Sequence, residues 1–322
     1  MTQSHPTQLS GPKPVQSVLG EFPFESLGIT DAHNHVWIEK VKGADGSAPV
    51  LDQFESIRTE LLEYRSAGGV SLLDCQPGGC GRNGDKLVQL SKDTKVNIIA
   101  CSGFHRKKYY SPGHWFFSTT EADLADYLIS EYTVGLEETK ESPNPPRAGF
   151  FKIALEASWK ETPQAAMEAT AVAAKITGAL VEIHTEKGSL AEKAVLFFED
   201  RGVKPVQLVL CHMDKRPDLG LHSELGRYGV LVEYDTFHRY KYKPEENLWP
   251  LITGMCKAGL CNRIALGLDM AESEMYKSIG NGPGLASLLT WVKPRLIEMQ
   301  IPLNSIQEML GGNIARRLAG LI

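Results

Sequence analysis

Four short apolar runs of the sequence each end in side chains that bind metal ions well. Val-Glu-Ile-His ends at His184, Leu-Val-Leu-Cys-His at His212, and Ile-Ala-Leu-Gly-Leu-Asp at Asp269. The run Ile-Thr-Asp-Ala-His-Asn-His supplies a pair, His33 and His35. Side chains alternate between the two faces of a strand, so histidines two positions apart point the same way. Imidazoles and a carboxylate gathered in one place are the ligands of a hydrolytic metal centre.

Each of these residues also has a purely structural interpretation. A single histidine is more often a surface or core residue than part of a site. His184 and His212 gain weight because they end successive predicted strands, whose backbones lie about 5 Å apart. Asp269 could instead cap the helix that follows its strand. The pair favours metal binding more strongly, because core packing rarely places two imidazoles on one face.

Lys152 interrupts the stretch Gly-Phe-Phe-Lys-Ile-Ala-Leu, which otherwise suits a buried strand. A buried lysine must have its charge neutralised, paired or chemically removed. Burial lowers the pKa of a lysine, and a neutral amine can react with CO2 to give a carbamate. A carbamate is an anionic ligand able to bridge two metal ions. The alternative is an ion pair of Lys152 with Glu156 or Glu182.

These residues require a fold that brings the ends of several strands together. Short apolar runs alternate with amphipathic segments, a pattern typical of repeated β-α units and a parallel sheet. The alternation predicts eight strands, over residues 27–32, 70–75, 96–102, 149–155, 179–184, 206–212, 230–234 and 263–269. We therefore expect an α/β fold, a (β/α)8 TIM barrel with parallel strands, with an open doubly wound sheet as the alternative. Strands of a barrel share one mouth at their carboxyl ends, where active sites are built.

Length and composition limit the organisation of the chain. Its 322 residues, 42% hydrophobic and 23% charged, are typical of a soluble protein. The length fits a single α/β barrel domain, a metal-dependent hydrolase domain over residues 21–322. Residues 1–20 are polar and Pro-rich, which predicts a flexible N-terminal arm. A net charge of −5 gives no footprint for nucleic acid. No apolar stretch approaches the roughly 20 residues that cross a bilayer, so no membrane partner is expected.

The N-terminus lacks the apolar core of a signal peptide, which predicts a cytoplasmic protein. In that compartment the six cysteines are expected to be free thiols. The partner that the sequence indicates is a small-molecule substrate. Barrels of this size are often dimers, so a homodimer stays open.

The order of the chemistry-bearing residues resembles the binuclear centre of the phosphotriesterase branch of the amidohydrolase superfamily. The resemblance covers nearly the whole chain, from about Gly28 to Ala319, and includes Gly-Phe-Phe-Lys-Ile-Ala, His-Met-Asp and Gly-Gly-Asn-Ile-Ala-Arg-Arg-Leu. It implies two divalent metal ions, of which zinc is expected from imidazole-rich ligation, with manganese or cobalt as compatible alternatives. The implied ligands are His33, His35 and Asp269 on the more buried ion, His184 and His212 on the more exposed one, and carboxylated Lys152 as the bridge.

The same resemblance implies a reaction. A hydroxide bridging the two ions attacks a carbonyl or phosphoryl group, and Asp269 is the catalytic residue that accepts its proton. The sequence is most similar to the sugar-lactonase group, through Tyr-Asp-Thr-Phe-His-Arg-Tyr-Lys-Tyr-Lys-Pro and Tyr-Lys-Ser-Ile-Gly-Asn-Gly-Pro-Gly. We therefore expect the opening of a sugar or aldonic acid lactone, free or phosphorylated. The alternatives are an organophosphate or carboxyl-ester hydrolase with the same centre, and a non-catalytic ligand-binding barrel.

Basic and tyrosine side chains in the loops after the strands are the expected substrate contacts. Corresponding loops of the sugar-lactonase group hold a phosphorylated lactone, and the loop after the third strand is placed to reach the mouth. The expected contacts are Arg239, Lys241, Tyr276, Lys277, Lys107 and Tyr110. Glu272 departs from the pattern, because it stands in a stretch expected to carry arginine and a carboxylate repels phosphate. The basic runs could instead be solvated surface.

Overall fold

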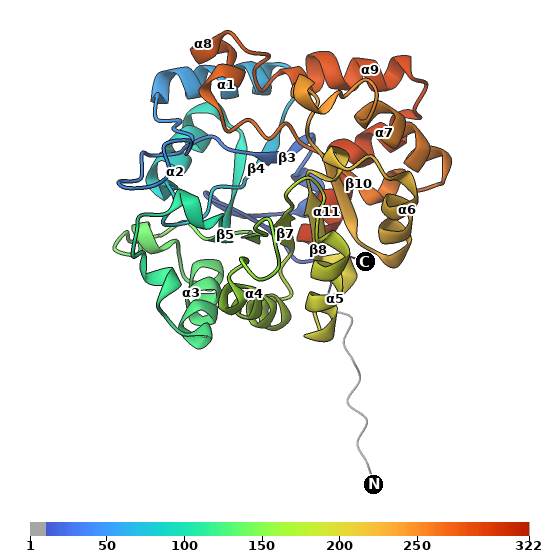
Figure 1. Cartoon of the computed structure of the whole chain (residues 1–322). Coiled ribbons are helices and arrows are strands. Elements are labelled where there is room, and N and C mark those ends of the chain that lie inside the picture. Colours follow the sequence, from blue (N-terminus) through green and yellow to red (C-terminus); the bar gives the residue numbers. More distant parts are fainter. Residues whose placement is uncertain (1–10, 322) are drawn as a thin grey trace.

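Eight parallel strands surrounded by helices make up the fold in the computed structural model, which describes residues 11–321 (Figure 1). Neighbouring strands are hydrogen-bonded in chain order from the first to the last. The strands are β3 (Thr30–Asn34), β4 (Ser71–Asp74), β5 (Asn97–Phe104), β6 (Phe150–Ala154), β7 (Val181–His184), β8 (Leu208–Cys211), β9 (Leu231–Tyr234) and β10 (Ile264–Leu266). The predicted TIM barrel is confirmed, and each predicted strand overlaps one of these.

Helices follow the strands and cover the outside of the barrel (Figure 1). They are α1 (Phe54–Ser66), α2 (Gly84–Thr94), α3 (Glu121–Thr133), α4 (Gln164–Thr177), α5 (Ala191–Asp200), α6 (Leu219–Tyr228), α7 (Leu248–Lys257), α8 (Lys277–Gly280), α9 (Lys293–Glu298), α10 (Leu303–Gln307) and α11 (Asn313–Leu318). None of the helices within residues 11–321 has the length and apolarity needed to span a membrane.

Two apolar clusters support the barrel. The larger one packs the outward faces of the strands against the helices, as with Ile98, Ile183 and Leu266. The smaller one fills the amino-terminal end of the barrel and includes Val15 together with Ile314 of α11. The carboxyl ends of the strands carry polar residues instead, so the site has to be sought there.

The N-terminal segment corrects the predicted boundary of the flexible arm, residues 1–20. Residues 1–10 lie outside the described residues, but β1 (Val15–Ser17) pairs with β2 (Gly20–Phe22) in an antiparallel hairpin. The Val18 amide donates to the Ile98 carbonyl at 2.9 Å. Val15 is buried in the smaller cluster, and this burial outweighs the Pro-rich composition that suggested an arm.

The cysteines partly depart from the expectation of free thiols. Cys256 and Cys261 form a disulfide, because the end of α7 and the short turn after it bring their Cα atoms to 4.5 Å. Cys75, Cys80, Cys101 and Cys211 are free and buried.

A buried arginine joins the loop after β4 to the long connection between β5 and β6. Arg82 has no exposed side-chain surface. Its Nε donates to Glu138 at 2.8 Å, and its Nη1 donates to Glu131 at 3.1 Å and to the Cys101 carbonyl at 2.6 Å. Burial lowers the pKa of Arg82, but the two carboxylates outweigh it and raise the pKa well above its usual value. The connection is thereby fixed beside the barrel mouth.

We predict that Arg82→Met lowers the free energy of unfolding by about 3–5 kcal/mol, because it leaves buried carboxylates without a partner. Urea unfolding measures the loss. Arg58→Met is the matched control, because Arg58 pairs with Glu55 and Asp93 at the surface and such pairs contribute about 1 kcal/mol or less. Equal losses in the two variants would contradict the prediction.

Candidate active site

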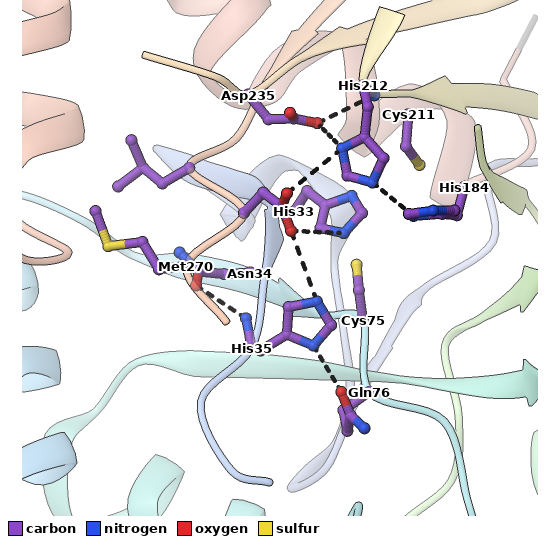
Figure 2. Close-up of polar contacts among 12 residues, drawn as sticks. His33, Asn34, His35, Cys75, Gln76, His184, Cys211, His212, Asp235 and Met270 are labelled. Atoms are coloured by element: carbon purple, nitrogen blue, oxygen red, sulfur yellow. Dashed lines mark hydrogen bonds and ion pairs between the residues drawn. The ribbon is translucent and has the colours of Figure 1, made fainter. Parts of the chain in front are cut away.

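The six expected metal ligands converge at the carboxyl ends of the strands. Figure 2 shows the imidazoles of His33, His35, His184 and His212 grouped together. His33 lies in β3 and His184 ends β7, while His212 directly follows β8. Asp269 follows β10, and Lys152 lies within β6.

Asp269 brings its carboxylate to the pair of histidines from the first strand. Its Oδ1 lies 3.8 Å from the Nε2 of His33 and 3.8 Å from the Nε2 of His35. These three residues each offer a ligand atom within 4.8 Å of the other two. His184 Nδ1 and His212 Nε2 form a second group, 2.8 Å apart. The two groups could hold two ions.

Each of the four histidines is oriented by a hydrogen bond between one ring nitrogen and a side-chain oxygen of another residue. The pairs are His33 Nδ1 with Glu233 (2.6 Å), His35 Nδ1 with Gln76 (2.8 Å), His212 Nδ1 with Asp235 (2.7 Å) and His184 Nε2 with Glu186 (3.0 Å). Such partners fix the tautomer and leave the other nitrogen for a metal ion. The arrangement could therefore hold a metal ion.

Burial sets the charges of these groups. It lowers the pKa of His35 to about 4 and the pKa of His33 and His212 well below the usual value. The imidazoles are therefore neutral at pH 7, which is the form that binds metals. Burial raises the pKa of Asp269, but Arg239, His212 and Lys215 outweigh it and bring the pKa to about 2. Asp269 is thus a carboxylate.

Two of the expected ligands have a strained backbone conformation. His212 has φ of 63° and Asp269 has φ of 47°, in the left-handed region that residues other than glycine rarely adopt. The turn at His212 directs its ring toward His184, and the turn at Asp269 directs its carboxylate back toward β3. Strain of this kind clusters at functional sites.

Lys152 is buried beneath the histidines, with 1% of its side chain exposed. Its Nζ lies 3.1 Å from His33 Nε2, 3.5 Å from Glu182 and 3.7 Å from Cys211 Sγ. The alternative pairing with Glu156 is wrong, because that carboxylate pairs with Arg106 at 3.0 Å. Burial lowers the pKa of Lys152, but Cys211 and the acidic surroundings outweigh it and raise the pKa well above its usual value. Without metal ions the ammonium is the stable form.

A pocket of about 640 Å³ opens above the histidines. The segment between Ile38 and Val50 forms one wall, and the loops after β5, β9 and β10 form the other walls. Its basic lining residues are Lys40, Lys108, Lys215, Arg239 and Lys241. Its apolar lining side chains are small or of medium size, apart from the rings of Tyr109 and Tyr242.

The expected substrate contacts divide between the pocket and the rest of the molecule. Arg239 and Lys241 line the pocket. Tyr276 is fully buried and its hydroxyl donates to the His35 carbonyl, so it holds the backbone of His35 instead. Lys277 is exposed and pairs with Glu63 at 2.9 Å.

The loop after β5 gives a similar correction. Lys107 places its ammonium over the ring of Phe117, at 5.2 Å. Tyr110 is buried, and its hydroxyl accepts a hydrogen bond from the His105 amide at 2.9 Å. Neither lines the pocket, because the aromatic residues of this loop pack on one another and carry both side chains away from the mouth.

Comparison with known proteins identifies the family. The family model described as the phosphotriesterase family matches residues 13–318. The chain belongs to the phosphotriesterase family. A phospho-furanose lactonase of Mycoplasmopsis synoviae is 26% identical over 327 residues, covering 95% of this chain and 91% of that protein. An N-acetyltaurine hydrolase of Danio rerio is 25% identical over 348 residues, covering 94% of this chain and 97% of that protein.

A solved structure shares the fold of this phosphotriesterase-family chain. The crystal structure of a lactonase from Listeria monocytogenes gives a TM-score of 0.86 at 22% identity, covering 95% of this chain and 99% of that one. The family and these relatives together indicate that the chain is a hydrolase.

The sequence did not point to several residues of this phosphotriesterase-family site. His105 lines the pocket, and its ring lies 5.5 Å from that of His184. The sequence did not indicate its role, because β5 ends at Phe104, two residues later than predicted, and His105 therefore directly follows the strand. Glu233 and Asp235, which orient two histidines, stand two apart at the end of Val-Glu-Tyr-Asp. Carboxylates at that spacing in a strand were a usable signal.

We predict that Asp235→Asn weakens zinc binding by about 10–100-fold, the usual effect of losing such an orienting partner. Asp235 accepts from both the ring and the backbone amide of His212, so the amide substitution disturbs the tautomer. Competition with a chelator measures the affinity. Asp126→Asn, on the exposed face of α3, is the control. An unchanged affinity for Asp235→Asn would exclude a ligand role for His212.

Proposed function

We propose that the protein is a metal-dependent hydrolase that opens a sugar or aldonic acid lactone. The observation that carries the proposal is a histidine-rich centre at the floor of a polar pocket lined by both basic and acidic side chains. A hydroxyl-rich lactone matches such walls, whereas a lipophilic organophosphate requires large apolar ones. The phospho-furanose lactonase among the relatives supports the same reaction class.

The donor set fits a pair of divalent ions. We propose that one ion is held by His33, His35 and Asp269, the other by His184 and His212, and that carboxylated Lys152 is shared between them. Neutral imidazoles with a carboxylate suit zinc, and manganese or cobalt are compatible. When bound, the ions supply a hydroxide at neutral pH and polarise the carbonyl oxygen of the lactone.

Side chains around the centre would transfer the proton and bind the substrate. Asp269, which is ionised at neutral pH, accepts the proton of the nucleophile and delivers it to the ring oxygen as the acyl C–O bond breaks. The Arg106 amide donates to His105 Nδ1 at 2.7 Å, so His105 carries its proton on Nε2. That N–H is a donor for a substrate oxygen in the pocket. Lys215 and Lys241 are further contacts on the basic side of the pocket.

Carboxylation of Lys152 is tested directly. We predict that a carbamate carbon appears in the NMR spectrum of protein supplied with ¹³C-labelled bicarbonate and zinc, and that it is absent without metal, because the unmetallated lysine is a stable ammonium. Lys152→Met is the control that removes the signal. A metal-loaded protein with full zinc content and no carbamate signal would show that Lys152 is not the bridge.

The reaction class is tested with a panel of substrates. Free and 5-phosphorylated aldonolactones, N-acetyltaurine and a phosphotriester are supplied to zinc-loaded protein, and the hydrolysis product of each is quantified by mass spectrometry. We expect lactones to have a kcat/KM at least about 100-fold above the others, and Asp269→Asn to lose about 10²–10⁴-fold of it. Asp126→Asn is the matched control. Preference for N-acetyltaurine or the phosphotriester would replace the lactonase proposal, and inactivity with bound metal would favour a ligand-binding barrel.

A further inference from the structure

Arg239 and Glu272 form an ion pair beside the candidate centre. Arg239 Nη1 donates to Glu272 Oε1 and Nη2 donates to Glu272 Oε2, both at 2.9 Å. This is the two-pronged geometry in which a guanidinium grips a carboxylate or a phosphate. Arg239 is 11% exposed and Glu272 is 47% exposed, so the arginine is the inner partner. Both residues line the pocket, so the carboxylate uses guanidinium N–H groups that an anionic ligand in the pocket would otherwise bind.

The rest of the guanidinium faces Asp269. Its Nη2 also donates to the Asp269 carbonyl and lies 3.3 Å from Asp269 Oδ2. Its Nε is buried and has no hydrogen-bond partner among residues 11–321. Arg239 is thus held between two carboxylates that come from the segment after β10. A phosphate reaching it would have to displace Glu272 and approach a second negative charge.

Two other cations of the pocket lie near the ring of Tyr242, and one of them also faces Asp269, because Lys215 Nζ lies 3.8 Å from Asp269 Oδ2. Lys215 and Lys241 place their ammonium groups over the ring of Tyr242, at 5.3 Å and 5.2 Å. An anion bound there would not need Arg239. The ion pair therefore balances the charge of Arg239 beside Asp269, whereas Lys241 and Lys215, which also faces Asp269, supply the positive charge around Tyr242.

We infer that Glu272 is a specificity-determining residue, which holds Arg239 as a brace for Asp269 and excludes phosphate from the part of the pocket next to the reacting atoms. This inference rests on the proposed function and narrows it. The substrate is an unphosphorylated lactone, whose hydroxyl groups donate to the exposed oxygens of Glu272. The ion pair explains why a carboxylate stands at position 272 in a stretch expected to carry arginine: Glu272 is the partner of Arg239.

Phosphate binding tests the inference without requiring turnover. Zinc-loaded protein is titrated calorimetrically with inorganic phosphate, as the original chain, Glu272→Gln, Arg239→Gln and the double variant. We expect Glu272→Gln to bind phosphate about tenfold more tightly, because the released guanidinium forms charge-assisted hydrogen bonds with it. The gain disappears when Arg239→Gln is added. Glu63→Gln is the matched control, since it removes a carboxylate from the surface pair with Lys277.

Kinetics test the consequence for substrate choice. The ratio of kcat/KM for a 5-phosphorylated lactone to that for the free lactone is expected to rise about tenfold in Glu272→Gln and to stay unchanged in Glu63→Gln. The inference is overturned if phosphate affinity does not rise, if the rise persists in the double variant, or if the original chain prefers phosphorylated lactones. Failure of the proposed function shows separately, as absence of turnover for every lactone, and the phosphate titrations still decide the role of Glu272.

Discussion

The seam between the first and last strands of the barrel is the interaction on which the site depends. The Leu268 and Asp269 amides donate to the His33 carbonyl, at 3.2 Å and 2.9 Å. The buried Asp31 carboxylate accepts from the amides of His33 and Leu268, at 3.2 Å and 3.1 Å. Because the seam joins backbone to backbone, it places a carboxylate from near the end of the chain within reach of histidines from its beginning. The contacts that close the barrel therefore also bring Asp269 to His33 and His35.

Strand periodicity made the barrel and the ligand cluster predictable. Each histidine or carboxylate stands next to an apolar run, so its place at a strand end follows from local sequence. The tautomers of His33 and His212 could not be predicted in the same way, because the carboxylates that orient them, Glu233 and Asp235, come from a different part of the chain. The loops were the least predictable part: Tyr276 turns inward to a backbone carbonyl and Lys277 turns outward to Glu63. Those outcomes depend on tertiary contacts that no local pattern records.

Charge balance is a recurring feature of this barrel. Lys152 has Glu182 beside it, and Arg82 is held by two carboxylates. Arg239 stands between Glu272 and Asp269. Buried ions need such partners because removing one partner leaves an uncompensated charge in a medium of low dielectric. In the sequence, each of these cations is recognisable only as a charged residue close to apolar ones. Its partner can be identified only once the fold is known.

The left-handed backbone at His212 and Asp269 has a consequence for how this chain can change. A residue with a Cβ atom in that conformation costs about 1–2 kcal/mol, and glycine would relieve the cost. Random substitution under selection for stability alone would therefore favour glycine at both positions, at the expense of the imidazole and the carboxylate. Stability of the backbone and retention of the imidazole and the carboxylate therefore make opposite demands at these two positions, and a stabilised variant of this barrel is best sought among its helices rather than at its mouth.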